Sequence, residues 1–208
     1  GAYVDTHIAV AEGVEADIIF DGTRIKNDDA YCSDINYCTG PTYSKLFPLL
    51  EINGTANIYT REDSRLEAEH ERDYTATVSV SGLMRMRQLE ESEKQGTLEI
   101  VSFLSAIGTN TSRTGKFYME GGSLSLDGGI GQYGDALGEI AVTGGTLAIA
   151  SNIAMCADRI RISGGRIQGK SVASNLTVFD GNKSTTITGG VIKYDGGKDG
   201  DDGFSFRG

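Results

Sequence analysis

The C-terminal tail combines carboxylates with glycines, a pattern that suits a calcium ion. In YDGGKDGDDGFSF, four aspartates are interspersed with glycines: Asp195, Asp199, Asp201 and Asp202. Calcium takes about six to eight oxygen ligands from flexible loops, and glycine allows backbone carbonyls to join the carboxylates. The tail therefore predicts a metal site at these aspartates, with calcium as the cofactor. A solvated acidic tail without a ligand is the alternative.

A second candidate site lies in the segment 27–48, which is rich in Asn, Asp and Tyr. It contains Tyr31, Tyr37 and Tyr43. Aromatic rings beside amides and carboxylates suit stacking on a sugar. We therefore predict that these three tyrosines bind ligand, and the alternative is that they pack the segment against the rest of the protein.

The same segment holds two of the three cysteines. Cys32 and Cys38, in AYCSDINYC, could close a small loop, and we expect a disulfide between them if the protein is secreted. A zinc site is not indicated, because the sequence has two histidines and no second cysteine pair.

No set of residues indicates a catalytic centre. A Ser-His-Asp or Cys-His arrangement would have to use His7 or His70, which stand in polar contexts at an end and in a loop. Arg24, Ile25 and Lys26 match a polygalacturonase motif, but Asn-Asp-Asp follows at once, in the wrong order, and no Gly-His-Gly exists. We therefore expect no catalytic residues.

The net charge excludes several partners. The chain has 208 residues and a formal net charge of −10. Such a protein repels phosphates, so nucleic acid and anionic membrane surfaces are not expected partners. No apolar run reaches the roughly 18 residues of a membrane-spanning helix. The acidity is typical of a soluble, extracellular or cation-binding protein.

Four similar segments with a Gly-Gly pair indicate which elements carry these residues. They are KFYMEGGSLSL, EIAVTGGTLAI, RIRISGGRIQG and STTITGGVIKY, with pairs beginning at Gly121, Gly144, Gly164 and Gly189. Apolar and polar residues alternate on both sides of each pair, which is the period of a strand with one buried face. The glycines stand where the chain must bend.

The apolar positions align between these segments and predict a stacked core. Before the glycines the aligned sets are Phe117, Ile140, Ile160, Thr185 and Met119, Val142, Ile162, Ile187; after them they are Leu124, Leu147, Ile167, Ile192 and Leu126, Ile149, Gly169, Tyr194. Ile107, Ile130 and Ile153 form a further set at intervals of 23 residues. We therefore predict an all-β fold, a single-stranded right-handed parallel β-helix (β-solenoid) with coils of roughly 20–26 residues. An antiparallel β-sandwich is the rival, but it does not predict a constant period.

The N-terminal half keeps the pattern less regularly. Gly22, Gly54, Gly82 and Gly96 each stand between alternating strands. Two segments look like insertions, one near 27–48 and a charged one near 61–74 that we expect to be a solvated loop. No linker is visible, so residues 1–208 are predicted to form one domain.

The segment AIGTNTSRTGKFYMEGGSLSLDGGIGQYGDALGEIAVTGGTLAIAS resembles the Ala-Ile-Gly and Gly-Gly repeats of bacterial cell-surface proteins described as carbohydrate-binding-domain-containing or adhesin-like. ADIIFDGTRIKN, LEINGTANIYT and GTLEIVS are similar to strands that precede those repeats, so the resemblance covers residues 15–195. It implies a parallel β-helix on a secreted or wall-attached protein. The segments 27–48 and 61–74 depart from the usual pattern.

These observations favour a non-catalytic surface module that is secreted or displayed on a bacterial cell and binds a polysaccharide or a host or matrix ligand. Two alternatives stay open. One is a polysaccharide lyase or hydrolase, because the parallel β-helix also hosts such enzymes, and the other is a purely structural stalk. A cluster of carboxylates and basic residues along one face of the solenoid would favour the enzyme.

Overall fold

The computed structural model describes residues 7–27, 48–68, 76–89, 95–109, 113–131, 135–151, 153–170, 177–195 and 205–207, and the description below concerns these residues alone. They form one sheet of 16 strands and contain no helix. The strands are β1 (Ile8–Val10), β2 (Glu15–Phe20), β3 (Arg24–Asn27), β4 (Leu50–Ile52), β5 (Thr55–Thr60), β6 (Ser64–Ala68), β7 (Val78–Val80), β8 (Leu83–Met86), β9 (Thr97–Gly108), β10 (Lys116–Met119), β11 (Ser123–Ile130), β12 (Leu137–Val142), β13 (Thr146–Ala150), β14 (Ile153–Lys170), β15 (Thr177–Asp195) and β16 (Ser205–Arg207).

The strands stack in three parallel ladders, and each coil contributes one strand to each ladder. Ladder 1 contains β1, β4, β7, residues 105–108 of β9, 129–130 of β11, 153–155 of β14, 177–179 of β15, and β16. Ladder 2 contains β2, β5, β8, β10, β12, residues 157–162 of β14 and 181–187 of β15. Ladder 3 contains β3, β6, residues 97–102 of β9, 123–127 of β11, β13, residues 166–170 of β14 and 191–195 of β15.

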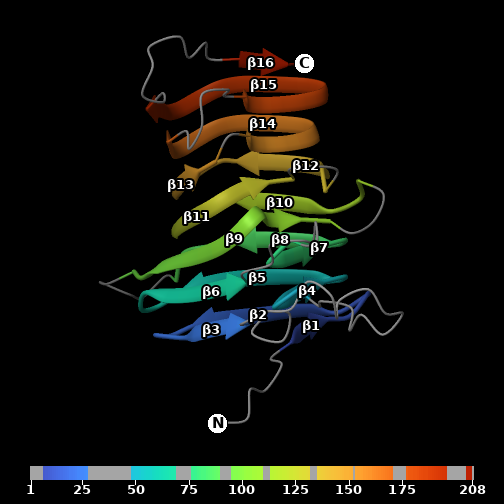
Figure 1. The fold of residues 1–208 in the computed structure, drawn as a ribbon, viewed down its shortest axis with the longest axis vertical. Coiled ribbons are helices and arrows are strands. Elements are labelled where there is room, and N and C mark those ends of the chain that lie inside the picture. Colours follow the sequence, from blue (N-terminus) through green and yellow to red (C-terminus); the bar gives the residue numbers. More distant parts are fainter. Residues whose placement is uncertain are drawn as a thin grey trace, which may run out of the picture.

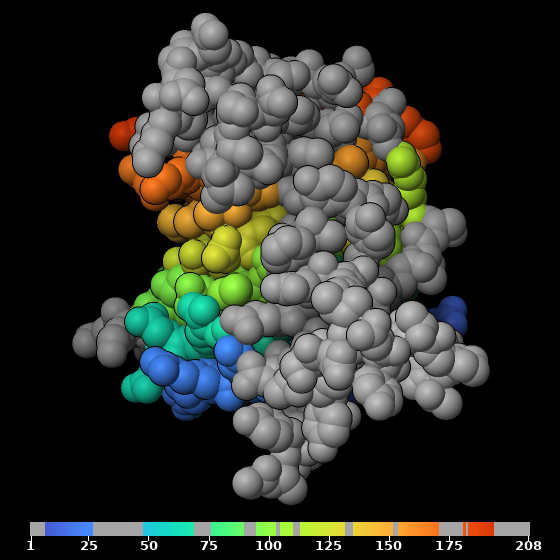
Figure 2. Space-filling model, viewed as in Figure 1, coloured from blue at the N-terminus to red at the C-terminus, as the bar shows by residue number. Residues whose placement is uncertain are grey.

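The fold is therefore an all-β parallel solenoid. Figure 1 shows the coils stacked along the long axis, from β1–β3 at the bottom to β16 at the top. In Figure 2 the exposed parts of successive coils form bands of colour in the same order. Every described pairing is parallel, which excludes the antiparallel sandwich.

The core of the coils up to β14 lies where the repeat predicted it, but the prediction is wrong for Ile187 in β15, which is 41 % exposed. Phe117, Ile140 and Ile160 are register partners, and all three side chains are fully buried. Leu124 and Leu147 pair in the same way in ladder 3. Each strand lies about 4.8 Å above the equivalent strand of the coil below. An apolar side chain in one coil therefore contacts the apolar side chain at the same position in the next coil.

The predicted alignment of Ile107, Ile130 and Ile153 is wrong at its third member. Ile107 and Ile130 are partners in ladder 1, but Ile130 pairs with Met155 and not with Ile153. Met155 is fully buried. The offset to the next coil is 23 residues at Asp127, which pairs with Ala150, and 25 at Ile130, so equal intervals in sequence do not give equal positions in the ladder.

The expectation of a solvated loop over 61–74 is wrong for β6. Its Ser64, Leu66 and Ala68 are buried, and β6 lies in ladder 3 between β3 and β9. The charged side chains Arg65 and Glu67 alternate with the buried ones and point outward. Residues 69–75 and the proposed insertion at 28–47 lie outside the described residues.

Both glycines of the Gly-Gly corner permit close stacking, and the second also permits the bend. Gly144 lies against the coil below, and a Cβ there would come within 2.4 Å of the Glu120 carbonyl oxygen. A Cβ at Gly145 would come within 2.8 Å of the Gly121 backbone. Gly145 also has φ of +73°, a conformation that a side chain disfavours.

Candidate ligand-binding face

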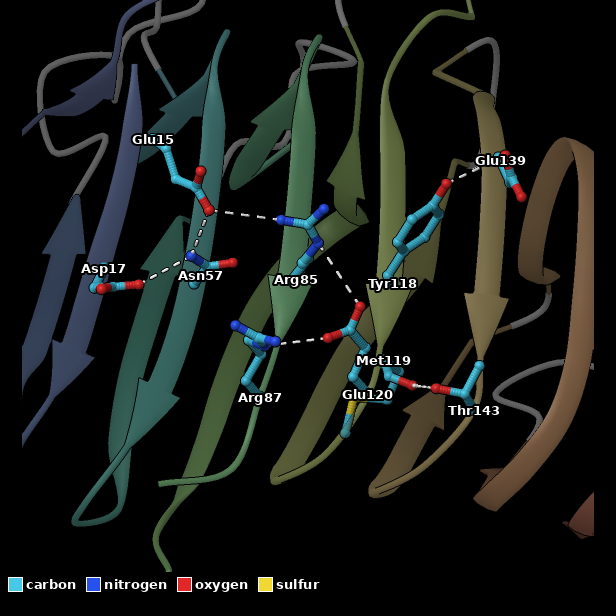
Figure 3. Close-up of polar contacts among 10 residues, drawn as sticks. All are labelled: Glu15, Asp17, Asn57, Arg85, Arg87, Tyr118, Met119, Glu120, Glu139 and Thr143. Atoms are coloured by element: carbon cyan, nitrogen blue, oxygen red, sulfur yellow. Dashed lines mark hydrogen bonds and ion pairs between the residues drawn. The ribbon is translucent and has the colours of Figure 1, made fainter. Parts of the chain in front are cut away.

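Charged and aromatic side chains gather on the outer side of ladder 2. We call the outward side chains of this ladder between Glu15 and Ser163 the polar face. Its polar members are Glu15, Asp17, Thr55, Asn57, Tyr59, Arg85, Arg87, Lys116, Tyr118, Glu120, Glu139, Thr143, Asp158, Arg159, Arg161 and Ser163. Figure 3 shows part of this face, with side chains from five successive coils.

Strand alternation places these residues. In β8 the side chains of Met84 and Met86 are fully buried, so Arg85 between them must point outward. β10 repeats the arrangement, with Tyr118 between the buried Phe117 and Met119. The apolar core pattern of the repeat thus fixes which residues form the polar face.

At its N-terminal end, the polar face carries a carboxylate pair held by an amide. Asn57 is 4 % exposed, and its Nδ2 donates to Glu15 Oε1 at 3.1 Å and to Asp17 Oδ1 at 2.9 Å. Arg85 approaches the same Glu15 carboxylate at 3.7 Å (Figure 3). These contacts connect the first three coils.

Two guanidinium groups share one carboxylate in the middle of the face. Glu120 accepts from Arg87 Nε at 3.1 Å and lies 3.7 Å from Arg85 Nε (Figure 3). A hydrogen bond to Tyr59, together with the charge of Glu120, raises the pKa of Arg87. Arg87 therefore stays protonated while it fixes the orientation of Glu120.

The most buried charge of the face is Glu139 in β12. This residue is 8 % exposed, and its carboxylate accepts from the Tyr118 hydroxyl at 3.4 Å and pairs with Arg161. Burial, and next the charge of Glu139, raise the pKa of Tyr118, so its hydroxyl remains a donor. Glu139 is thus held from two neighbouring coils.

Two basic side chains of the face have no such partner. Lys116 and Arg159 are exposed, and neither forms an ion pair or a side-chain hydrogen bond with the described residues. Both are register partners of Glu139, one in the coil below and one in the coil above.

The carboxylates of the face differ in how closely they approach one another. Glu15 and Asp17 both accept from Asn57 Nδ2, so these two carboxylates lie close together. Glu120 and Glu139 lie in adjacent coils, but they are four residues out of register, which separates their Cα atoms by about 13 Å along the strand direction. Figure 3 shows Tyr118 between these two glutamates, and each is held by a different arginine.

A carboxyl group with a raised pKa occurs elsewhere, beside ladder 1. Burial raises the pKa of Asp135 from 3.8 to about 7, and a hydrogen bond from Ser105 opposes this shift. Asp135 is 8 % exposed and packs against Gly108. Its contacts with Ser105 and Gly108 place it beside ladder 1.

The sites expected from sequence lie largely outside the described residues. This holds for Tyr31, Tyr37 and Tyr43, for Cys32 and Cys38, and for Asp199, Asp201 and Asp202. Asp195 ends β15, but its side chain is not among those described. The tyrosine site, the disulfide and the calcium site therefore stay predictions.

Other titratable groups give no metal centre within the described ranges. No group of three or more His, Cys, Asp or Glu side chains there could hold a metal ion. His7 contacts the Pro48 carbonyl at 2.8 Å and Glu51 at 3.3 Å. Cys156 is half-buried.

Sequence reasoning missed the polar face, although a signal was present. The aligned segments KFYME, EIAVT and RIRIS carry Lys116, Glu139 and Arg159 at one outward position. The core positions of the repeat are alike in every coil, whereas these outward residues differ from coil to coil. A comparison of the variable positions would have found the face.

No family model, curated protein or solved structure matches this chain. In the described parts of the chain, no helix is long and apolar enough to cross a membrane.

Proposed function

We propose that this protein is a non-catalytic binding module of a bacterial surface or secreted protein, and that its polar face binds a glycan. The observation that supports this most directly is the set of outward tyrosine, arginine and carboxylate side chains along ladder 2. Planar rings offer an apolar surface to a sugar ring, while charged groups give directional hydrogen bonds to hydroxyls. The repeat of the strands spreads these groups over several coils, which suits an extended polymer.

The polar face is a cluster of carboxylates and basic residues along one face of the solenoid, so the lyase or hydrolase stays open as an alternative. Glu120 and Glu139 are each held by arginine, which supports a role in binding. The carboxyl group with the raised pKa, Asp135, lies beside another ladder. A binding face needs only fixed side-chain positions, and these hydrogen bonds provide them.

The proposal also includes the handedness of the β-helix and an extracellular location for the protein. We propose a right-handed, single-stranded β-helix, because parallel connections within a sheet are right-handed in nearly all proteins. The resemblance of the Gly-Gly repeats to cell-surface proteins and the net charge of −10 support an extracellular location.

The experiment is a glycan array probed with the full chain, in the presence and absence of calcium. Tyr118→Ala removes the ring in the middle of the polar face, and Lys193→Ala is the control because Lys193 is exposed on ladder 3. We expect binding that Tyr118→Ala weakens and Lys193→Ala leaves unchanged. Equal binding by both variants would place the ligand elsewhere.

Two other outcomes would replace the proposal. Binding to no glycan would favour the structural stalk. Cleavage of a polysaccharide by the wild-type protein would favour the lyase or hydrolase. A loss of binding on calcium removal would support the predicted site at Asp195, Asp199, Asp201 and Asp202.

A further inference from the structure

One row of the polar face places two cations on either side of a buried carboxylate, and neither cation has a side-chain partner among the described residues. Lys116 in β10, Glu139 in β12 and Arg159 in β14 are register partners in three successive coils. Because coils are about 4.8 Å apart, the Cα atoms of Lys116 and Arg159 are separated by about 10 Å. Both basic side chains leave the sheet in the same direction.

Glu139 does not neutralise these cations. Its carboxylate pairs with Arg161 and accepts from the Tyr118 hydroxyl, and its side chain is only 11 % exposed. Lys116 and Arg159 are exposed and have no partner among the described side chains. Two positive charges therefore remain available to a molecule that binds over this row.

The charge around the row has the opposite sign to that of the whole protein. The described outward side chains of ladder 2 from Leu83 to Ser163 include five basic residues, Arg85, Arg87, Lys116, Arg159 and Arg161, and three acidic ones, Glu120, Glu139 and Asp158. The chain as a whole carries −10. A local positive field on an acidic protein directs an anion to that place.

We infer that the ligand is an acidic glycan and that the row from Lys116 to Arg159 is the subsite for its anionic group. This inference rests on the proposed function, since it names the chemical class of glycan. A carboxylate or sulfate group sits between the two side chains, where the Arg159 guanidinium can donate two parallel hydrogen bonds and Lys116 supplies a point charge. The half-buried ring of Tyr118, two residues from Lys116 along β10, contacts the adjoining sugar ring.

The test compares polymers that differ only in charge. Polygalacturonate and its fully methyl-esterified form share a backbone, but the ester removes the carboxylate charge. Dextran sulfate and dextran form the corresponding pair for sulfate. We expect binding by isothermal titration of the full chain to one charged member, about tenfold or more tighter than to its neutral partner, and weakened by added salt. The pair that shows this preference identifies the anionic group as a carboxylate or a sulfate.

The variant is Lys116→Gln with Arg159→Gln, and its matched control is Lys193→Gln, which removes an exposed cation from ladder 3. We expect the double variant to lose the preference for the charged polymer while its melting temperature stays unchanged. The control keeps the wild-type preference.

The failures of the two proposals are distinguishable. Equal binding of charged and neutral polymers, or an unchanged preference in the double variant, overturns the acidic subsite and leaves glycan binding intact. Absence of binding to any polymer on the array and in the titrations overturns both.

Discussion

Arg161 in β14 pairs with Glu139 in β12 across one coil boundary, two residues out of register. The arginine side chain is 60 % exposed, whereas the glutamate side chain is 11 % exposed. The diagonal contact leaves Arg159, the residue in register with Glu139, without a side-chain partner among the described residues. The same pair therefore anchors the middle of the polar face and leaves a cation for a ligand.

Replacement of Glu139 tests how much this anchor stabilises the coil stack. Glu139→Ala removes a buried, charge-assisted hydrogen-bond acceptor, and we expect it to lower the free energy of unfolding by about 1.5–3 kcal/mol. Glu99→Ala is the control, because its pair with Arg65 is exposed and is expected to contribute under about 1 kcal/mol. Urea denaturation measures both, and equal losses would contradict the difference in burial.

The stability of the protein should fall as pH rises, because of Asp135. Its folded-state pKa of about 7 exceeds the usual value of 3.8, so the folded protein binds this proton more tightly than the unfolded chain does. The contribution is complete below about pH 4 and is lost as pH rises through 7. Since one pKa unit corresponds to about 1.4 kcal/mol, Asp135→Asn should stabilise the fold at pH 8 by up to about 4 kcal/mol.

The control for Asp135→Asn is the same comparison at pH 4, where both proteins carry a neutral side chain at this position. Chemical denaturation at the two pH values gives the difference directly. An equal effect of the substitution at pH 4 and pH 8 would show that packing, and not ionisation, causes it.

Substitutions at Gly13 and Gly144 distinguish the cost of a left-handed backbone from the cost of a steric clash between coils. Gly13 has φ of +77° and no atom within 4 Å of an added Cβ, so Gly13→Ala costs only the left-handed strain, about 1–2 kcal/mol. A Cβ at Gly144 would meet the Glu120 carbonyl oxygen at 2.4 Å, which requires the coils to move apart. We expect Gly144→Ala to cost more than about 3 kcal/mol. Similar midpoints in urea for the two variants would refute close stacking at this corner.

Met155 tests the register of ladder 1. It is fully buried as the partner of Ile130, so Met155→Ala should cost about 2–5 kcal/mol. Ile187 is the control, because it is 41 % exposed and Ile187→Ala removes less buried surface. A smaller loss for Met155→Ala than for Ile187→Ala would contradict the assigned register.

The core of ladders 2 and 3 could be predicted from sequence because one side chain type recurs at one position. Phe117, Ile140 and Ile160 needed only an alignment on the glycines. Met155 could not be placed in this way, because a register shift near Gly129 breaks the equal spacing. β6 was missed because its charged residues, Arg65 and Glu67, conceal the alternation of Ser64, Leu66 and Ala68.

The polar face was harder to predict for a different physical reason. Core positions repeat because each must pack against its own equivalent, whereas outward positions are free to differ. Lys116, Glu139 and Arg159 become neighbours only through the register of three coils, which no single repeat displays. The residues that form a functional face of a solenoid therefore come from several coils and are not visible in any one repeat.

The central claim is that the polar face binds a glycan, and the affinity of one variant tests it most directly. The dissociation constant of the strongest glycan from the array is measured for the wild type and for Tyr118→Ala, with the melting temperature of each. The account predicts at least about tenfold weaker binding by the variant, since an aromatic contact and a fixed hydroxyl are lost together. An unchanged dissociation constant in a folded Tyr118→Ala protein would contradict it.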